Sequence, residues 1–223
     1  MSWLRTAVLW NVDSWLGAWW QFRYTTRPRD PRQLGTGDRA PVLLLPGVYE
    51  PWEFMLPIGR RLHEAGHPVH ALPALGHNRI PIPDAAALAQ RYLEHHDLRS
   101  VAVVGHSKGG IIGKHMMAVD DAAGRIARLV AIASPFSGSR LARYAPVSTL
   151  RAFRGTDPML TTLAGNLAAN SRITSIYGEF DPMVPERSHL DGATNVELPV
   201  VGHFSVLRDR RVLEAVLAAI DPA

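Results

Sequence analysis

The chain has 223 residues, of which 47% are hydrophobic and 20% are charged, and these values are typical of one folded domain. The formal net charge of +4 is small for this length, and no basic run is interleaved with aromatic residues, so the sequence does not fit a nucleic-acid-binding protein. There is no cysteine, which excludes disulfides, thiolate metal sites and a cysteine nucleophile and favours a reducing compartment.

Residues 1–35 are predicted to form a Trp-rich helical extension followed by a linker. The apolar stretch is interrupted by Asn11, Asp13 and Ser14, so it lacks the long apolar region of a signal peptide, and we expect a cytoplasmic location. The helix either makes peripheral contact with a membrane or packs on the domain and buries its tryptophans. Packing is favoured because apolar stripes are more often core than anchor. The tryptophans concerned are Trp3, Trp10, Trp15, Trp19 and Trp20.

Residues 36–223 are predicted to form the catalytic domain, in which short apolar runs alternate with helical patterns. Uniformly apolar strands separated by helices predict an α/β fold with a mostly parallel sheet of about six strands and helices on both faces. Residues 137–171 fit this alternation poorly and are expected to form loops and short helices over the active site. The expected strands are 41–46, 67–72, 100–104, 128–133, 172–177 and 195–200, and the expected helices are 52–65, 83–96, 109–117 and 212–220.

The sequence Gly105-His106-Ser107-Lys108-Gly109 matches the pattern G-x-S-x-G. It follows a predicted buried strand and precedes a predicted helix, which is the context of a nucleophile elbow. The tight turn requires small flanking residues, and the helix N-terminus favours developing negative charge. Ser107 is therefore the candidate nucleophile.

A serine nucleophile needs a general base and an acid that orients the base. Asp181 follows the fifth predicted strand and begins a turn, and it is preferred to Glu179, which lies closer to the strand end. His203 follows the sixth strand beside a glycine and is the candidate base. His106 lies inside the elbow and should point away from the serine hydroxyl, whereas His77 follows the second strand and is a candidate for the pocket.

An oxyanion hole requires two fixed N–H donors. The main-chain N–H of Lys108 is one candidate, and the N–H of Val48, in the loop that begins at Pro46 and Gly47, is the other. The Lys108 side chain is interpreted as a surface or helix-start lysine. Four residues are candidates for the substrate pocket, with ordinary packing as the alternative: His77, Phe136, Met159 and Phe204.

From residue 41 onward the chain resembles the small, lidless bacterial lipases of the α/β-hydrolase superfamily. The resemblance is carried by the elbow, by residues 175–177, Asp181 and 190–196, and by the sequence Val-Gly-His-Phe at 201–204. It implies hydrolysis of carboxylic esters through an acyl-enzyme, without metal or cofactor. It also implies that Ser107, His203 and Asp181 form a catalytic triad and that Val48 and Lys108 donate to the oxyanion. The family usually has His-Gly in the oxyanion loop, where this chain has Pro46-Gly47.

Three alternatives to ester hydrolysis remain open. The same triad could transfer an acyl group to an alcohol other than water, or cleave amides, lactones or carbon–carbon bonds. From a different class, the fold could be a binding protein with a disabled site, although the intact order of serine, aspartate and histidine argues against this. The expected partner is a small-molecule or lipid ester.

Overall fold

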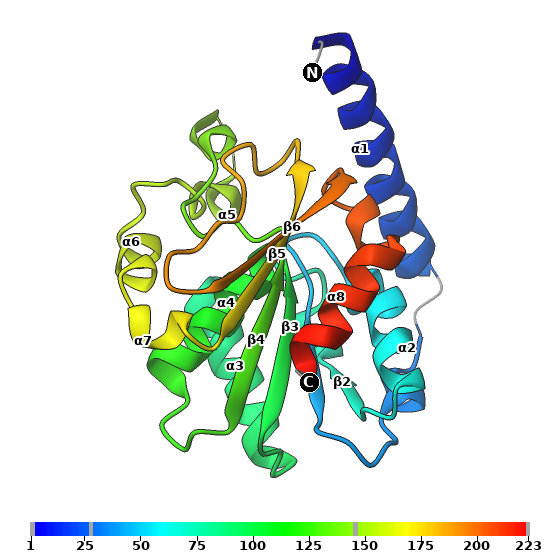
Figure 1. The fold of residues 1–223 in the computed structure, drawn as a ribbon, viewed down its shortest axis with the longest axis vertical. Helices are drawn as coiled ribbons and strands as arrows, with labels where there is room; N and C mark the ends of the chain where they lie inside the picture. Colours follow the sequence, from blue (N-terminus) through cyan, green and yellow to red (C-terminus); the bar gives the residue numbers. More distant parts are fainter. Residues whose placement is uncertain (1–2, 27–28, 145–146, 222–223) are drawn as a thin grey trace.

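A sheet of six parallel strands forms the centre of the molecule (Figure 1). The computed structural model describes residues 3–26, 29–144 and 147–221, with the backbone alone for residues 3–9 and 148. The strands lie in the order β2-β1-β3-β4-β5-β6, and every neighbouring pair is parallel. The predicted α/β fold is thus confirmed. The strands are β1 Val42–Leu45, β2 Val69–Ala71, β3 Val101–His106, β4 Ile126–Ile132, β5 Ile173–Phe180 and β6 Thr194–Val201.

Both faces of the sheet are covered because its central strands are apolar on both sides. Successive side chains of a strand point to opposite faces. Leu43 and Leu45 accordingly join one core cluster with α3 and α4, and Val42 and Leu44 join a second with α1, α2 and α8. Figure 1 shows these two helix layers on either side of the sheet. The main helices are α1 Trp3–Thr26, α2 Leu56–Glu64, α3 Ile82–His95, α4 Lys108–His115 and α8 Arg210–Ile220.

Short helices occupy residues 137–171, as expected. They are the 3-10 helix Arg140–Tyr144 and the helices α5 Ser148–Arg151, α6 Pro158–Ala164 and α7 Leu167–Asn170. Of these, the 3-10 helix and α5 contribute to the wall of the pocket described below. The first part of this segment therefore lines the pocket, whereas α6 and α7 contribute no residue to its lining.

The long N-terminal helix α1 packs on the α/β body through one face. Asp13, Gly17, Trp20 and Tyr24 are buried and recur every three or four residues along that face. Trp20 and Tyr24 both contact the ring of Phe54, at centroid distances of 5.6 Å and 6.1 Å. Within the described part of the chain, no helix has the length and apolar character needed to cross a bilayer.

The expectation that α1 buries its tryptophans is correct for one of them and wrong for three. Trp20 is fully buried, whereas Trp10, Trp15 and Trp19 are exposed. The side chain of Trp3 lies outside the described residues. A single helix therefore combines a packed face with an aromatic face turned to solvent.

Candidate active site

The elbow that carries Ser107 connects β3 to α4 through a strained backbone. Ser107 has φ 51° and ψ −116°, a conformation that an L residue adopts only under structural constraint. A Cβ atom at Gly109 would collide with the carbonyl oxygen of Leu45, and one at Gly105 would collide with the backbone of Gly109. Both flanking positions therefore require glycine, as the motif predicts.

Asp181 and His203 follow the carboxyl ends of β5 and β6, at the same sheet edge as Ser107. Nδ1 of His203 lies 2.7 Å from Oδ2 of Asp181. The carboxylate also accepts hydrogen bonds from the N–H groups of Met183 (2.7 Å) and Val184 (3.0 Å). These two bonds fix the position of the carboxylate in the turn after β5. Glu179, the rival acid, is exposed. A carboxylate can only accept, so Nδ1 carries the proton and Nε2 is left with a lone pair.

The histidine is almost completely buried, and its surroundings raise its pKa. Burial is the largest influence and on its own lowers the pKa of His203. The charge of Asp181, its hydrogen bond, and the charges of Glu50 and Asp13 together outweigh burial, so that the pKa lies above its ordinary value. Ser107 and His203 line the same pocket but make no direct hydrogen bond, a spacing common in catalytic sites without substrate.

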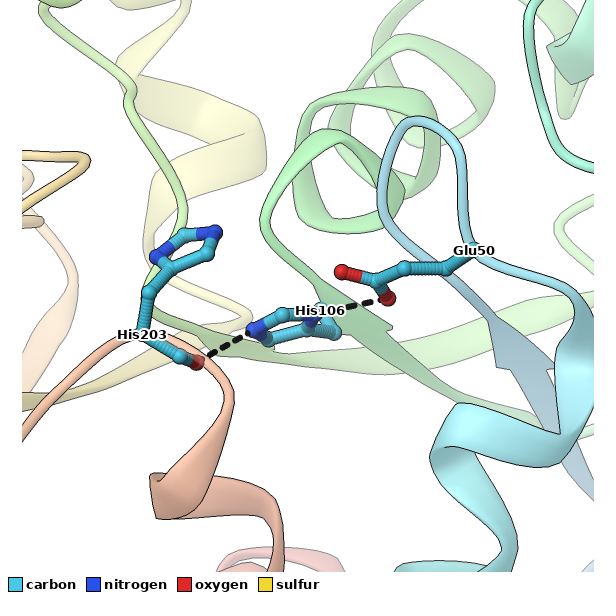
Figure 2. Close-up of side chains that lie close together, drawn as sticks. All are labelled: Glu50, His106 and His203. Carbon is cyan, nitrogen blue, oxygen red and sulfur yellow. Dashed lines mark hydrogen bonds and ion pairs between the residues drawn. The ribbon is translucent and has the colours of Figure 1, made fainter. Parts of the chain in front are cut away.

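A second buried pair, Glu50 and His106, lies beside His203 (Figure 2). His106 Nδ1 is 2.9 Å from Glu50 Oε2, and its Nε2 is 2.9 Å from the carbonyl oxygen of His203. The N–H of Gly47 also donates to Glu50 Oε2, at 2.7 Å. The pair thus ties the loop after β1 to the backbone of His203. His106 points away from the serine, as expected, but sequence reasoning missed this bridging role.

Glu50, His106 and His203 also form a group whose nitrogen and oxygen atoms lie within 4.8 Å of one another, as a metal site would require. However, both ring nitrogens of His106 face protein oxygen acceptors, one of which is a carbonyl that can only accept. His106 therefore offers no free lone pair to a metal ion. The group is explained by hydrogen bonding within the protein.

The loop after β1 is positioned through the side chain of Lys108. This lysine begins α4, as one of its two interpretations expected, but the other interpretation, a surface residue, is wrong. Lys108 is buried, and its Nζ donates to the carbonyl oxygens of Asn78 (2.8 Å) and Ile80. Asn78 in turn donates through Nδ2 to the carbonyl of Pro46, at 2.7 Å. Burial lowers the pKa of Lys108 to about 8. The expected oxyanion donor Val48 therefore stands on a loop fixed from both sides, by Glu50 and by Asn78.

Ser107 opens onto a pocket of about 500 Å³, a volume typical of small-molecule sites. Phe204 lines it, as expected, and so does Val48, the expected oxyanion donor. Residues on α1 form one wall, residues of the 140–153 segment form another, and most of the lining side chains are apolar. The lining also includes Gly17, Ala18, Phe54, Leu141, Leu150, Phe153 and Met183.

Three of the predicted pocket residues lie elsewhere. His77 is held by Thr25 at the end of α1 (3.0 Å). Phe136 is buried in the core and lies beneath the ammonium group of Lys114, and Met159 packs against the same core cluster. Tertiary packing, which a local pattern does not reveal, placed these side chains away from the pocket.

Comparisons with known proteins agree with this fold. A family model described as a PGAP1-like alpha/beta domain matches residues 86–165, from α3 to the end of α6. Lipase BlEst2 from Bacillus licheniformis, in its mature form, superposes with a TM-score of 0.64 at 14% identity, covering 87% of this chain and 94% of that one.

Two other solved structures give similar results. The monoacylglycerol lipase of Paleococcus ferrophilus has a TM-score of 0.62 at 15% identity, covering 83% of this chain and 95% of that one. A structure from a study of carboxylesterases of the archaeon Nitrososphaera gargenis has a TM-score of 0.58 at 18% identity, covering 82% and 92%. At these identities the likeness establishes the fold alone. The chain has the α/β-hydrolase fold.

Proposed function

We propose that this protein is a serine hydrolase that cleaves carboxylic esters through an acyl-enzyme. The observation that carries the proposal is the hydrogen bond of 2.7 Å between His203 Nδ1 and Asp181, in a pocket that also contains the strained Ser107. This bond leaves His203 Nε2 unprotonated, as a general base for Ser107 requires. The lipase and carboxylesterase names of similarly folded proteins agree with it.

In the first half of the reaction, His203 Nε2 takes the proton of Ser107 as Oγ attacks the ester carbonyl carbon. The tetrahedral oxyanion is stabilised by the main-chain N–H groups of Val48 and Lys108. His203 then gives its proton to the leaving alcohol oxygen as the carbon–oxygen bond breaks. In the second half, His203 takes a proton from water as the water oxygen attacks the acyl carbon. His203 then returns this proton to Oγ as the bond between the acyl carbon and Oγ breaks, which releases the acid and regenerates Ser107.

The pocket supports an ester with an apolar acyl group. The pocket has a volume of about 500 Å³ and is lined mainly by aliphatic and aromatic side chains. Each methylene group of an acyl chain that is buried there contributes hydrophobic binding energy. Its one acidic lining residue, Glu50, is already bound by Gly47 and His106, so no lining side chain is free to recognise a cationic substrate. We therefore expect a neutral acyl chain of short to medium length.

Hydrolysis of p-nitrophenyl esters from acetate to palmitate, by wild type and by Ser107→Ala, tests the proposal. We expect turnover by wild type with an optimum at an intermediate chain length, and loss of at least a thousandfold of kcat in the variant. An added alcohol that competes with water for the acyl group would indicate acyl transfer. Turnover of amides or lactones but not of esters would mean that the enzyme cleaves a different type of bond. A wild type that is inactive on all of these substrates would indicate a binding protein.

A further inference from the structure

The N-terminal helix α1 reaches the backbone around His203 through a buried carboxylate, Asp13. The main-chain N–H of His203 donates to Asp13 Oδ2 at 2.7 Å, and that of Ser205 donates to Oδ1 at 3.0 Å. The N–H of Phe204 lies 3.2 Å from both oxygens. One side chain from the start of the sequence thus binds three consecutive N–H groups about 190 residues later.

Two glycines allow α1 and the segment 202–205 to approach each other closely. Gly202 has φ 107°, and a Cβ atom there would lie 2.6 Å from Asp13 Oδ1. One turn further along α1, a Cβ atom at Gly17 would lie 2.7 Å from the ring of Phe204. Asp13 is 3% exposed, and no ion pair with it occurs in the described part of the chain. Its carboxylate is therefore held by main-chain N–H groups, and its charge acts on His203.

We propose that Asp13 is a positioning residue for the hydrolase reaction: it fixes the backbone of residues 203–205, and its charge acts on the imidazole of His203. This inference rests on the proposed function. It makes α1 part of the active site and not an appendage, since the same helix also forms one wall of the pocket.

The effect of the Asp13 charge on the pKa of His203 has a direction that can be measured. The charged groups around His203 are Asp181 after β5, Glu50 after β1 with its partner His106, and Asp13 on α1, and the three carboxylates each raise the pKa of His203. Removal of the Asp13 charge lowers that pKa. The base then stays unprotonated at lower pH, so the acidic limb of the rate profile moves to lower pH.

The test compares the pH profile of kcat/KM for wild type and Asp13→Asn on a water-soluble p-nitrophenyl ester. We expect kcat to fall roughly ten- to a hundredfold, as for a small misplacement of the base, together with the shift of the acidic limb. Asp157→Asn is the matched control, because Asp157 also accepts from two main-chain N–H groups (3.0 Å and 3.4 Å) but lies outside the pocket. It should leave kcat and the pH profile unchanged.

A folded Asp13→Asn variant with the wild-type kcat and pH profile would overturn the inference. If this variant does not fold, Asp13→Ser, which keeps an oxygen acceptor without the charge, provides the same readouts. Failure of both to fold would assign Asp13 a purely structural role and would also overturn the inference. A wild type without esterase activity would instead refute the proposed function, so the two failures are distinguishable.

The opposite face of α1 carries a row of large apolar side chains. In the described part of the chain these side chains are exposed. We call Val12, Trp15, Trp19 and Phe22 the aromatic stripe; they recur every three or four residues and are 52–75% exposed. Large exposed apolar patches mark interaction surfaces, and tryptophan is enriched where proteins meet the lipid headgroup region.

The charge around the aromatic stripe is suited to an anionic surface. Between residues 10 and 26, Asp13 is the single acidic residue, and it is buried on the far face of the helix. Arg23 lies over the ring of Trp19, 5.5 Å from its centroid, so a cation borders the stripe. Figure 1 shows that α1 projects past the sheet edge at which β5 and β6 end.

From this second observation we infer that the aromatic stripe docks on an anionic lipid bilayer. Tryptophan side chains would enter the headgroup region while Arg23 stays at the surface beside the lipid phosphates. Docking in this way would place the pocket wall formed by Ala18 and Gln21 beside the bilayer. A lipid ester could then reach Ser107 without crossing bulk water.

Sedimentation with vesicles of phosphatidylcholine and phosphatidylglycerol in equal parts tests the docking. Wild type should bind, and the triple variant Trp15→Ser, Trp19→Ser, Phe22→Ser should lose most of the binding while it still hydrolyses a soluble ester. The double variant Val119→Ser, Leu167→Ser is the matched control, since these residues are exposed apolar residues on other elements. Equal binding by wild type and the triple variant, or a dimer that the triple variant dissociates without any vesicle binding, would overturn the inference.

Discussion

His203 is surrounded by carboxylates from three separate parts of the chain, and the nearest of them, Asp181, controls its protonation and orientation. The substitution Asp181→Asn removes the charge and allows the imidazole to adopt the wrong tautomer. We expect kcat to fall by about 10⁴-fold. Because the charge of Asp181 raises the pKa of His203, the acidic limb of the residual activity should move to lower pH. A pH profile of kcat/KM measures both effects, and an unshifted limb would contradict this assignment.

The burial of Lys108 lowers its pKa, and this makes the stability of the protein depend on pH in a way that can be tested. Its folded pKa of about 8 lies below the ordinary lysine pKa of 10.5, so between these two pH values the unfolded chain holds more protons than the folded protein. The free energy of unfolding contributed by this residue therefore rises as pH increases beyond about 8. Lys108→Met removes this rise and deprives the carbonyls of Asn78 and Ile80 of their donor, the first of them buried, at a cost of about 1–3 kcal/mol.

Urea unfolding of wild type and Lys108→Met on both sides of pH 8 measures these effects. The difference in free energy of unfolding between the two proteins should grow with pH. A constant difference would mean that the lysine has its ordinary pKa in the folded protein.

At the scale of elements, α1 is attached through Trp20, which is completely buried against Phe54 and lies under Arg208, 4.0 Å from the ring centroid. Trp20→Ala should lower the free energy of unfolding by about 3–5 kcal/mol, because it leaves a large cavity. Trp15→Ala, on the exposed face of the same helix, should change it by less than about 0.5 kcal/mol. Chemical denaturation of the two variants provides the comparison, and equal effects would contradict the described packing of α1.

The elements themselves could be predicted because their sequence patterns are local. Apolar runs such as residues 100–104 predicted strands, and the glycines around Ser107 predicted the elbow, since both depend on neighbours in sequence. Asp13, Glu50 and the Lys108 side chain could not be assigned in this way. Their partners lie 190, 56 and about 30 residues away, and only the folded sheet edge brings them together. The local sequence feature that could have indicated a role for Asp13 is its position as an acidic residue in an otherwise largely apolar helical stretch.

At the scale of the whole molecule, the parallel sheet brings the ends of β1, β3, β5 and β6 to one edge, and each of the proposed catalytic groups follows one of those ends. Helix α1 closes the same edge from the side. The division of the chain at residue 35 into an extension and a catalytic domain remains a prediction. Under the inference drawn from Asp13, a chain that begins after α1 should keep the sheet but lose most of the activity.

The central claim is that Ser107 is a nucleophile activated by His203. A fluorophosphonate reacts with such a serine: Oγ forms a bond to phosphorus, fluoride leaves, and His203 takes the hydroxyl proton. Mass spectrometry of the folded protein after this treatment should show one adduct, on the peptide that contains Ser107, absent in Ser107→Ala and strongly slowed in His203→Ala. A folded wild type that remains unlabelled, or an adduct on a different residue, would contradict the account.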